Sequence, residues 1–508
     1  MVRSALEAWH ARLWRRVFAV DFRSLAAFRM AIGTVVVSDA LLRSRDASLM
    51  LSPDGLFPLA LVRDYLADPW AWSLATLVDS PWSGPLVLCL EAVAGLLLAA
   101  GCCTRCATIL SWVAVVSVLR RTGPATNAGD AWLVCLLFWS MFLPLGSAWS
   151  WDSRRGSHRG QVFTAATVAL VLQIAVVYLA AGVAKWNESW LSGDAVRFAV
   201  SVHDHGTPLG EWLLGHGWLA RPISWGVLAV ELVGPVLLIT WPAPRVRVSL
   251  VILFMLFHLA TCVTMTVGLF GYVGMAAWLA LLPTEAWDWL TARGTAGGPA
   301  TTEACNQQSW AARSTCIAAG TLALVSLLHD VTPWQRQPLP WPLPSLINIP
   351  CMHQEWDMFG DVRPQEQWVY ARAELADGSV VDLLREGRPL EAERPAGGFT
   401  SLPHHRWHKL FWGLPQPRQR IFAPAIAAAL ARHWNAHHPP SSGVLFLEIR
   451  YARLGRTATD DTLHELLLAT WPPRDAAGRG GLERLLDGPP PAAGKQSEAA
   501  TLPRSAID

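Results

Sequence analysis

Nine apolar stretches recur through the first 330 residues of this chain, and each approaches the length at which a helix crosses a bilayer. A helix rises 1.5 Å per residue, so a hydrocarbon core of about 30 Å takes about 20 apolar residues. Several stretches are shorter, and eight spans with one re-entrant piece fit as well as nine. The predicted helices lie near Leu25–Arg43, Pro85–Ala100, Ala107–Arg120, Ala131–Leu145, Phe163–Lys185, Ile223–Trp241, Val248–Val267, Leu269–Leu282 and Ala312–Leu328.

Composition supports a membrane protein. Hydrophobic residues make up 52% of the 508 positions, mean hydropathy is +0.29, and only 16% of residues are charged. Globular domains carry about 25% charged residues. The 28 tryptophans fit helix ends that lie at membrane interfaces. With a net charge of +2 and no basic face, we expect the lipid bilayer as a partner and no nucleic acid.

Basic residues predict the orientation. Cytoplasmic loops carry an excess of arginine and lysine. The N-terminal segment is basic, with Arg3, Arg12, Arg15 and Arg16, and its Ser4–Val20 stretch can form an amphipathic helix on the membrane surface. With nine spans, the C-terminus would then be extracytoplasmic. We expect an integral protein of the bacterial inner (cell) membrane with a cytoplasmic N-terminus.

The chain changes character after the last apolar stretch. A proline-rich linker leads into a polar region, where Trp368–Leu375 and Ser379–Leu384 read as strands joined by the hairpin signal Asp377-Gly378. A helix near Ile421–Asn435 and a strand near Val444–Tyr451 follow. We therefore predict an all-α polytopic membrane bundle of eight to nine transmembrane helices followed by a small α+β extracytoplasmic domain. The predicted division is 1–23 (basic segment), 24–330 (bundle), 331–350 (linker), 351–473 (α+β domain) and 474–508 (disordered tail).

Lys185 is the most informative single residue. It ends an apolar run at the predicted helix end and is flanked by Trp186 and Trp190. An amine removed from water gives up its proton more easily and can act as a base or nucleophile. The alternative is that Lys185 reaches the lipid headgroups while the tryptophans form an interfacial belt.

Other polar residues fall inside the predicted spans. Each buried charge costs a few kcal/mol unless it is paired or hydrated. Either these residues pair and fix helix packing, or they line a polar cavity. His258 lies mid-span, where it satisfies a neighbouring polar group or marks a proton path or ligand pocket. The candidate cavity residues are Arg29, Asp39, Glu91, Arg120, Asp130 and Glu231.

No metal site is expected. Cys102, Cys103 and Cys106 cluster in a predicted turn that offers no fourth ligand. His433 and His437 are spaced i, i+4, but no glutamate completes a metalloprotease motif. The chain also lacks a phosphate-binding loop, a nucleophile elbow and a dinucleotide fingerprint, so any active site is expected in the membrane bundle.

A series of short motifs recurs in order along the chain. They are Arg29 with Asp39, Ser52–Pro58, Arg120-Arg121, Gly129-Asp130, Phe142–Asp152, Tyr178–Gly193, Phe257-His258, Gly268–Tyr272, Gln354–Phe359, Asp377-Gly378 and Arg406-Trp407. In this order they resemble the HTTM family, membrane proteins related to the vitamin K-dependent gamma-glutamyl carboxylase. The resemblance covers roughly Phe22 to Leu282 and continues into the polar region.

The resemblance implies a function. In the carboxylase, the lysine that matches Lys185 deprotonates vitamin K hydroquinone, and oxygen then generates a strong base that removes a glutamate γ-proton before carbon dioxide adds. It implies Lys185 and His258 as catalytic residues and a reduced quinone as cofactor. It also implies an extracytoplasmic peptide substrate. The residues expected to contact the quinol are Trp186, Trp190, Phe257 and Tyr272.

One departure separates this chain from the carboxylase. The carboxylase has an Asn-His pair where this sequence has Gly146-Ser147, which puts peptidyl-glutamate carboxylation in doubt. Two alternatives therefore stand beside the enzyme. One is a non-catalytic HTTM protein for maturation or export of a secreted peptide. The other is a transporter or lipid-binding protein that uses the buried charges as a path.

Overall fold

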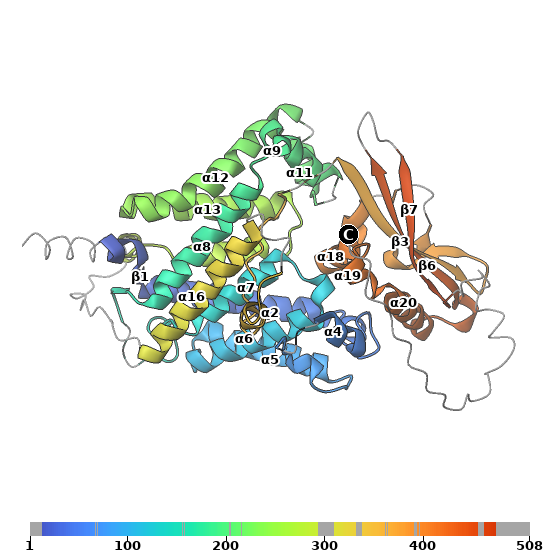
Figure 1. Ribbon diagram of the computed structural model, residues 1–508, viewed down its shortest axis with the longest axis horizontal. Coiled ribbons are helices and arrows are strands. Elements are labelled where there is room, and N and C mark those ends of the chain that lie inside the picture. Colours follow the sequence, from blue (N-terminus) through green and yellow to red (C-terminus); the bar gives the residue numbers. More distant parts are fainter. Residues whose placement is uncertain are drawn as a thin grey trace, which may run out of the picture.

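The computed structural model describes a helical bundle with a β-sheet domain beside it (Figure 1). The described residues are 13–66, 68, 70–154, 156, 158–202, 205–214, 216–292, 309–331, 338–360, 362, 364–390, 394–395, 397–455 and 462–473. Most of the predicted N-terminal amphipathic helix, part of the predicted linker (332–337) and the predicted tail (474–508) lie outside them.

Each of the nine predicted apolar stretches is a helix, and within the part of the chain that the structure describes six helices are long and apolar enough to cross a membrane. These six are α2, α5, α8, α12, α13 and α16. The other three helices do not meet this criterion: α7 and α14 are shorter apolar helices, and α6 carries three arginines. Eight to nine spans are therefore not confirmed. The bounds are α2 Phe22–Ser44, α5 Ser83–Ala100, α6 Thr104–Arg121, α7 Ala128–Ser140, α8 Ala165–Ala184, α12 Ala220–Thr240, α13 Pro244–Thr264, α14 Phe270–Leu279 and α16 Trp310–Val331.

Short elements join these helices. A two-residue strand pair, β1 (Val20–Asp21) and β2 (Gln161–Val162), ties the start of α2 to the segment before α8. The short helices are α3 Ala47–Met50, α4 Leu59–Leu66, α9 Glu188–Ser192, α10 Asp194–Arg197, α11 Pro208–Leu214, α15 Thr284–Ala292 and α17 Leu343–Asn348, with single turns at Leu74–Thr76, Gly123–Ala125, Phe198–Val202 and Gly217–Leu219.

Local sequence explains where the main helices begin and how closely they pack. Thr164 starts α8 with a reciprocal capping box to Thr167, which satisfies two backbone N–H groups that the first turn leaves open. Helices α2 and α5 approach closely at Gly33, where a Cβ would lie 2.7 Å from the Ala99 backbone nitrogen. Small residues at such crossings let backbones meet inside a bilayer.

The C-terminal domain is an antiparallel sheet of order β5-β4-β3-β6-β7 with helices packed on it. The predicted hairpin is present, with Ala373 opposite Val381. Strand β7 was not predicted, because it is a mostly exposed edge strand without alternating burial. The bounds are β3 Gln365–Leu375, β4 Val380–Asp382, β5 Arg388–Pro389, β6 Val444–Gly455, β7 Leu463–Trp471, α18 His405–Gly413, α19 Pro417–Arg420 and α20 Ala423–His437, with turns at Leu383–Arg385, Gly398–Ser401 and Pro440–Ser442.

The start of the predicted α+β domain packs into the bundle rather than onto the sheet. Met352 and Trp356 are each 1% exposed and belong to the hydrophobic core of the membrane helices. The sheet itself begins at Gln365. Met352 and Trp356 therefore fill space between the membrane helices.

The N-terminal end of α18 contacts the bundle. The side chain of Asp46, just after α2, accepts hydrogen bonds from His404 Nε2 and, at 3.0 Å, from Trp407 Nε1. Burial of Asp46 favours the neutral acid, but the hydrogen bonds from His404 and Trp407 outweigh it and hold the pKa of this carboxyl below its ordinary value. The contact therefore favours the ionised form of Asp46.

We predict that this contact weakens in acid. A depressed folded-state pKa gives stability that is present above the ordinary carboxyl value, about 3.9, and is lost as pH falls through the folded value. Asp46→Asn should therefore unfold at a lower temperature than the parent at pH 6, and the gap should close toward pH 3. Thermal unfolding in detergent checks this, with the exposed Glu386→Gln as control; a gap independent of pH would contradict it.

Candidate functional site

Lys185 is buried at the end of α8 and is paired with a carboxylate. Its side chain follows the last helical residue, and the residue is 3% exposed. The amine lies 3.1 Å from Oε1 and 3.0 Å from Oε2 of Glu231, which projects from the middle of α12 and is 6% exposed. A longer contact of 3.4 Å joins the amine to the Ala181 carbonyl. Lys185 therefore does not reach toward the surface.

A segment from beyond the bundle covers this pair. The Trp190 ring centre lies 5.5 Å from the Lys185 amine, and Trp190 Nε1 donates to the Phe359 carbonyl at 2.7 Å. Asn187 Nδ2 donates to the Gly360 carbonyl at 2.8 Å. The aromatic ring and this backbone keep water away from the amine, and low local polarity strengthens its interaction with Glu231.

His258 lies in a second polar site, between aromatic rings. Its Nε2 is 2.5 Å from the Tyr178 hydroxyl, which accepts a hydrogen bond of 2.8 Å from Trp278 Nε1. The donor in the bond between Tyr178 and His258 depends on the tautomer of the ring, because a hydroxyl oxygen has a second lone pair beside the one that Trp278 uses. Nδ1 of His258 has no hydrogen-bond partner among the described residues.

The two predicted catalytic residues lie along one helix but do not share a site. Tyr178 and Lys185 are seven residues apart on α8, which places them on the same face about 10 Å apart along the axis. Lys185 pairs with Glu231, whereas His258 bonds to Tyr178. Any reaction that uses both would have to span this separation.

The four aromatic residues predicted to contact a quinol fall into two groups. Trp190 is 5% exposed over Lys185, and the Phe257 ring lies 5.3 Å from His258. Trp186 and Tyr272 are 61% and 53% exposed and face outward. Only Trp190 therefore contributes a wall to the lysine site.

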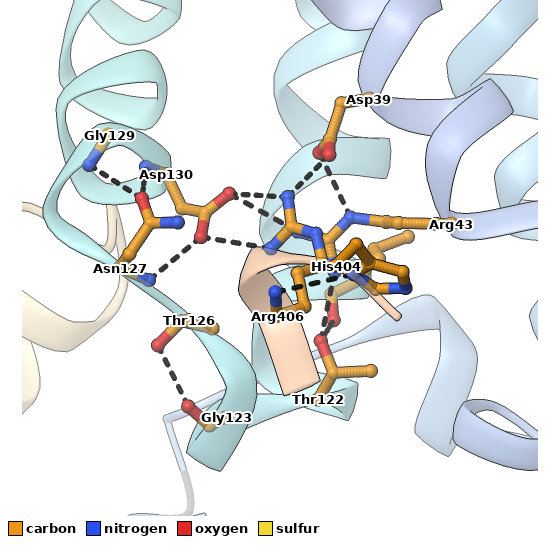
Figure 2. Close-up of polar contacts among 11 residues, drawn as sticks. Asp39, Arg43, Thr122, Gly123, Thr126, Asn127, Gly129, Asp130, His404 and Arg406 are labelled. Atoms are coloured by element: carbon orange, nitrogen blue, oxygen red, sulfur yellow. Dashed lines mark hydrogen bonds and ion pairs between the residues drawn. The ribbon is translucent and has the colours of Figure 1, made fainter. Parts of the chain in front are cut away.

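Four charges meet where α18 enters the bundle (Figure 2). Arg406 donates to both oxygens of Asp130, at 2.9 and 3.1 Å, and also pairs with Asp39. Arg43 lies 2.9 Å from Asp39 and 3.3 Å from Asp130. Two cations and two anions thus balance in a space where Arg406 is 0% and both aspartates 1% exposed.

Of the remaining predicted cavity residues, Glu91 lies near this cluster, within electrostatic range of all four of its charges, and the others lie elsewhere. Glu91 is 0% exposed, and within the described part of the chain neither of its carboxyl oxygens has a hydrogen-bond partner. Arg29 donates to the Trp149 carbonyl at 2.6 Å, and Arg120 donates to the Trp72 carbonyl at 2.6 Å. Glu231 pairs with Lys185. Asp39, Asp130 and Glu91 are therefore grouped at the charge cluster, whereas Arg29, Arg120 and Glu231 lie at separate sites.

Two members of the charge cluster were not predicted as partners. Arg43 follows Asp39 by four residues, a spacing that places both on one helix face and could have been recognised. Arg406 lies 276 residues from Asp130 in the chain, and no local pattern signals that contact. Burial disfavours the guanidinium charge, but Asp130 and Asp39 outweigh it and raise the pKa of Arg406.

The described residues contain no group of three or more histidine, cysteine or acidic side chains that could hold a metal ion. Cys103 and Cys106 are exposed and Cys102 is partly buried. The rings of His433 and His437 lie 4.4 Å apart on α20.

Comparison with known proteins gives one result. Residues 72–287 match the family model described as the HTTM domain. This chain carries an HTTM domain. The matched region contains Lys185, Glu231 and His258 but ends before the sheet domain. No curated protein and no solved structure matches the chain.

Removal of Arg406 should destabilise the protein strongly. Arg406→Ala leaves Asp39 and Asp130 with one cation between them, and an uncompensated buried charge costs about 3–5 kcal/mol. Arg406→Lys should recover only part of this loss, because an ammonium cannot form the bidentate pair. Thermal unfolding in detergent measures both, with the exposed Arg388→Ala as control. An Arg406→Ala protein as stable as Arg388→Ala would show that the cluster does not hold the domain in place.

Proposed function

We propose that this HTTM protein is a membrane-embedded, carboxylase-like enzyme in which Lys185 activates a quinol for oxygen-dependent chemistry on a peptide or other substrate. The observation that carries the proposal is the buried pair of Lys185 with Glu231 inside the HTTM domain. A lysine that served only as an interfacial anchor would extend toward water. This one is 3% exposed and held by a carboxylate.

The carboxylate decides how such a lysine can accept a proton. An ammonium group has no free lone pair, so Lys185 acts as a base only when its proton has moved to Glu231. That transfer leaves the charge of the pair unchanged, which makes it compatible with an apolar surrounding. After uptake of a substrate proton the pair carries one positive charge, and that charge would stabilise the anion left on the substrate.

The residues around the amine fit a quinol. The amine donates to Glu231 Oε1 and lies 3.0 Å from Oε2, which accepts no hydrogen bond from the described residues, and its other contact is to the Ala181 carbonyl at 3.4 Å. One hydrogen of the amine is therefore weakly held, and that position could face a hydroxyl oxygen of a quinol. Trp190 offers an aromatic wall, and aromatic rings favour stacked or edge contacts. A bound reduced quinone, similar to vitamin K hydroquinone, would supply the reducing equivalents for reaction with oxygen.

The departure at Ser147 does not alter the lysine site. Ser147 precedes α8, and its carbonyl accepts a hydrogen bond from His158 N at 2.9 Å. Lys185 lies at the far end of α8, whose 20 residues span about 30 Å. We therefore propose that activation of the quinol is retained here and that the acceptor of the later chemistry differs from a peptidyl glutamate or is bound in another way. The orientation with the sheet domain outside the cell belongs to this proposal.

Formation of quinol epoxide tests the function. Purified protein in detergent would receive a naphthohydroquinone and oxygen, and epoxide would be followed by mass spectrometry. We expect epoxide from the parent and at least a 100-fold loss in Lys185→Ala, the scale of general-base catalysis. Glu231→Gln should also lower the rate, because glutamine cannot store the proton.

The chain offers a matched control. It contains only three lysines, and Lys409 lies in α18, where its amine lies 4.7 Å from the centre of the Trp412 ring. Lys409→Ala should retain the parent rate. If a folded parent gives no epoxide with several quinols, or if Lys185→Ala matches Lys409→Ala, the enzyme proposal fails and a role in peptide maturation becomes the one to pursue.

A further inference from the structure

A groove opens between α8 and α16, on a different part of the bundle from Lys185. Its volume is about 790 Å³, within the range of about 300–1,000 Å³ typical of small-molecule sites. One wall is α8 from Ala165 to Val176, and the other is α16 from Arg313 to Leu327. On α16, Ile317 and Leu324 are 57% and 53% exposed, so this helix presents apolar side chains outward and the groove faces lipid.

The floor of the groove is polar although its walls are apolar. Trp139, Gln173 and Gln354 line it and are 2%, 5% and 2% exposed. Gln173 Nε2 donates to Gln354 Oε1 at 2.9 Å, and Trp139 Nε1 donates to Gln173 Oε1 at 3.3 Å. Trp356 Nε1 donates to Gln354 Oε1 at 2.8 Å, so both amide oxygens are occupied.

One donor on this floor remains unused. An amide nitrogen carries two hydrogens. Gln354 Nε2 has contacts to Gln173, Met352 and Cys135, whereas within the described residues Gln173 Nε2 meets a single acceptor. An unsatisfied N–H buried beside lipid is unfavourable, and lipid tails offer it no acceptor. An acceptor that enters from the membrane would satisfy this N–H.

The charge of the lining restricts what can enter. Among the described residues that line the groove, Arg313 alone is charged, and it is exposed in the first turn of α16. A charged group on the floor would meet no counterion. We propose that the groove binds an uncharged, membrane-soluble molecule whose carbonyl oxygen accepts from Gln173 and whose apolar tail lies along α8 and α16.

This site is separate from the one proposed for chemistry. Gln173 and Lys185 are 12 residues apart on α8, about 18 Å along the axis and on different faces. Ligand binding in the groove does not depend on Lys185 as a base, so the two proposals fail independently.

Photo-crosslinking in lipid nanodiscs tests the site. Two carbonyl sources would be compared, a diazirine-labelled prenyl naphthoquinone and a diazirine-labelled diacylglycerol, with labelled peptides mapped by mass spectrometry. We expect saturable labelling of α8 and α16 by at least one probe. Gln173→Leu should weaken it about tenfold, the effect of one lost hydrogen bond in an apolar site.

A second variant covers the case in which Gln173→Leu fails to fold. A Cβ built on Gly320, in the groove wall, has no described atom within 4 Å, so Gly320→Phe fills the groove without a backbone clash. Gly226, on the exposed side of α12, has equally open surroundings and gives the matched control Gly226→Phe. Labelling should be lost in Gly320→Phe and retained in Gly226→Phe and Lys185→Ala. Absence of saturable labelling by both probes, or equal labelling of Gly320→Phe and Gly226→Phe, would overturn the proposal.

Discussion

The arrangement of the two parts of this protein depends on one buried guanidinium. Arg406 lies in α18, a helix of the sheet domain, and its side chain pairs with Asp39 and Asp130 inside the bundle. Each of these charges alone would be expensive to bury, and together with Arg43 they form a neutral group of four. The two aspartates come from α2 and α7. The same interaction therefore holds these two helices together and positions the sheet domain against them (Figure 2).

Helix α8 organises the rest of the bundle. From its start toward its end it presents Gln173 to Gln354, Tyr178 to His258 and Lys185 to Glu231. The segment that supplies Gln354 continues to Gly360 and covers the lysine site. The groove and the lysine site thus share one helix and one connecting segment.

Much of this architecture could be predicted from the sequence, but the candidate site only in part. The nine apolar stretches are helices because backbone N–H and C=O groups in an apolar medium must form hydrogen bonds within their own segment. The position of Lys185 at the end of one of these stretches can be read directly from the sequence. The predicted number of spans is not confirmed, since α7 and α14 are shorter apolar helices and α6 carries three arginines. The edge strand β7 was missed because most of its side chains are exposed on both faces.

What the sequence determined is therefore the set of elements and the residue types that they carry, because hydropathy, helix caps and the Asp377-Gly378 turn act over a few residues. What only the tertiary structure decided is the choice of partners. Lys185 meets Glu231, 46 residues away, and Arg406 meets Asp39, 367 residues away. A buried charge must find a counterion, but which one it finds depends on the helices that pack beside it, and that packing is a property of the whole bundle.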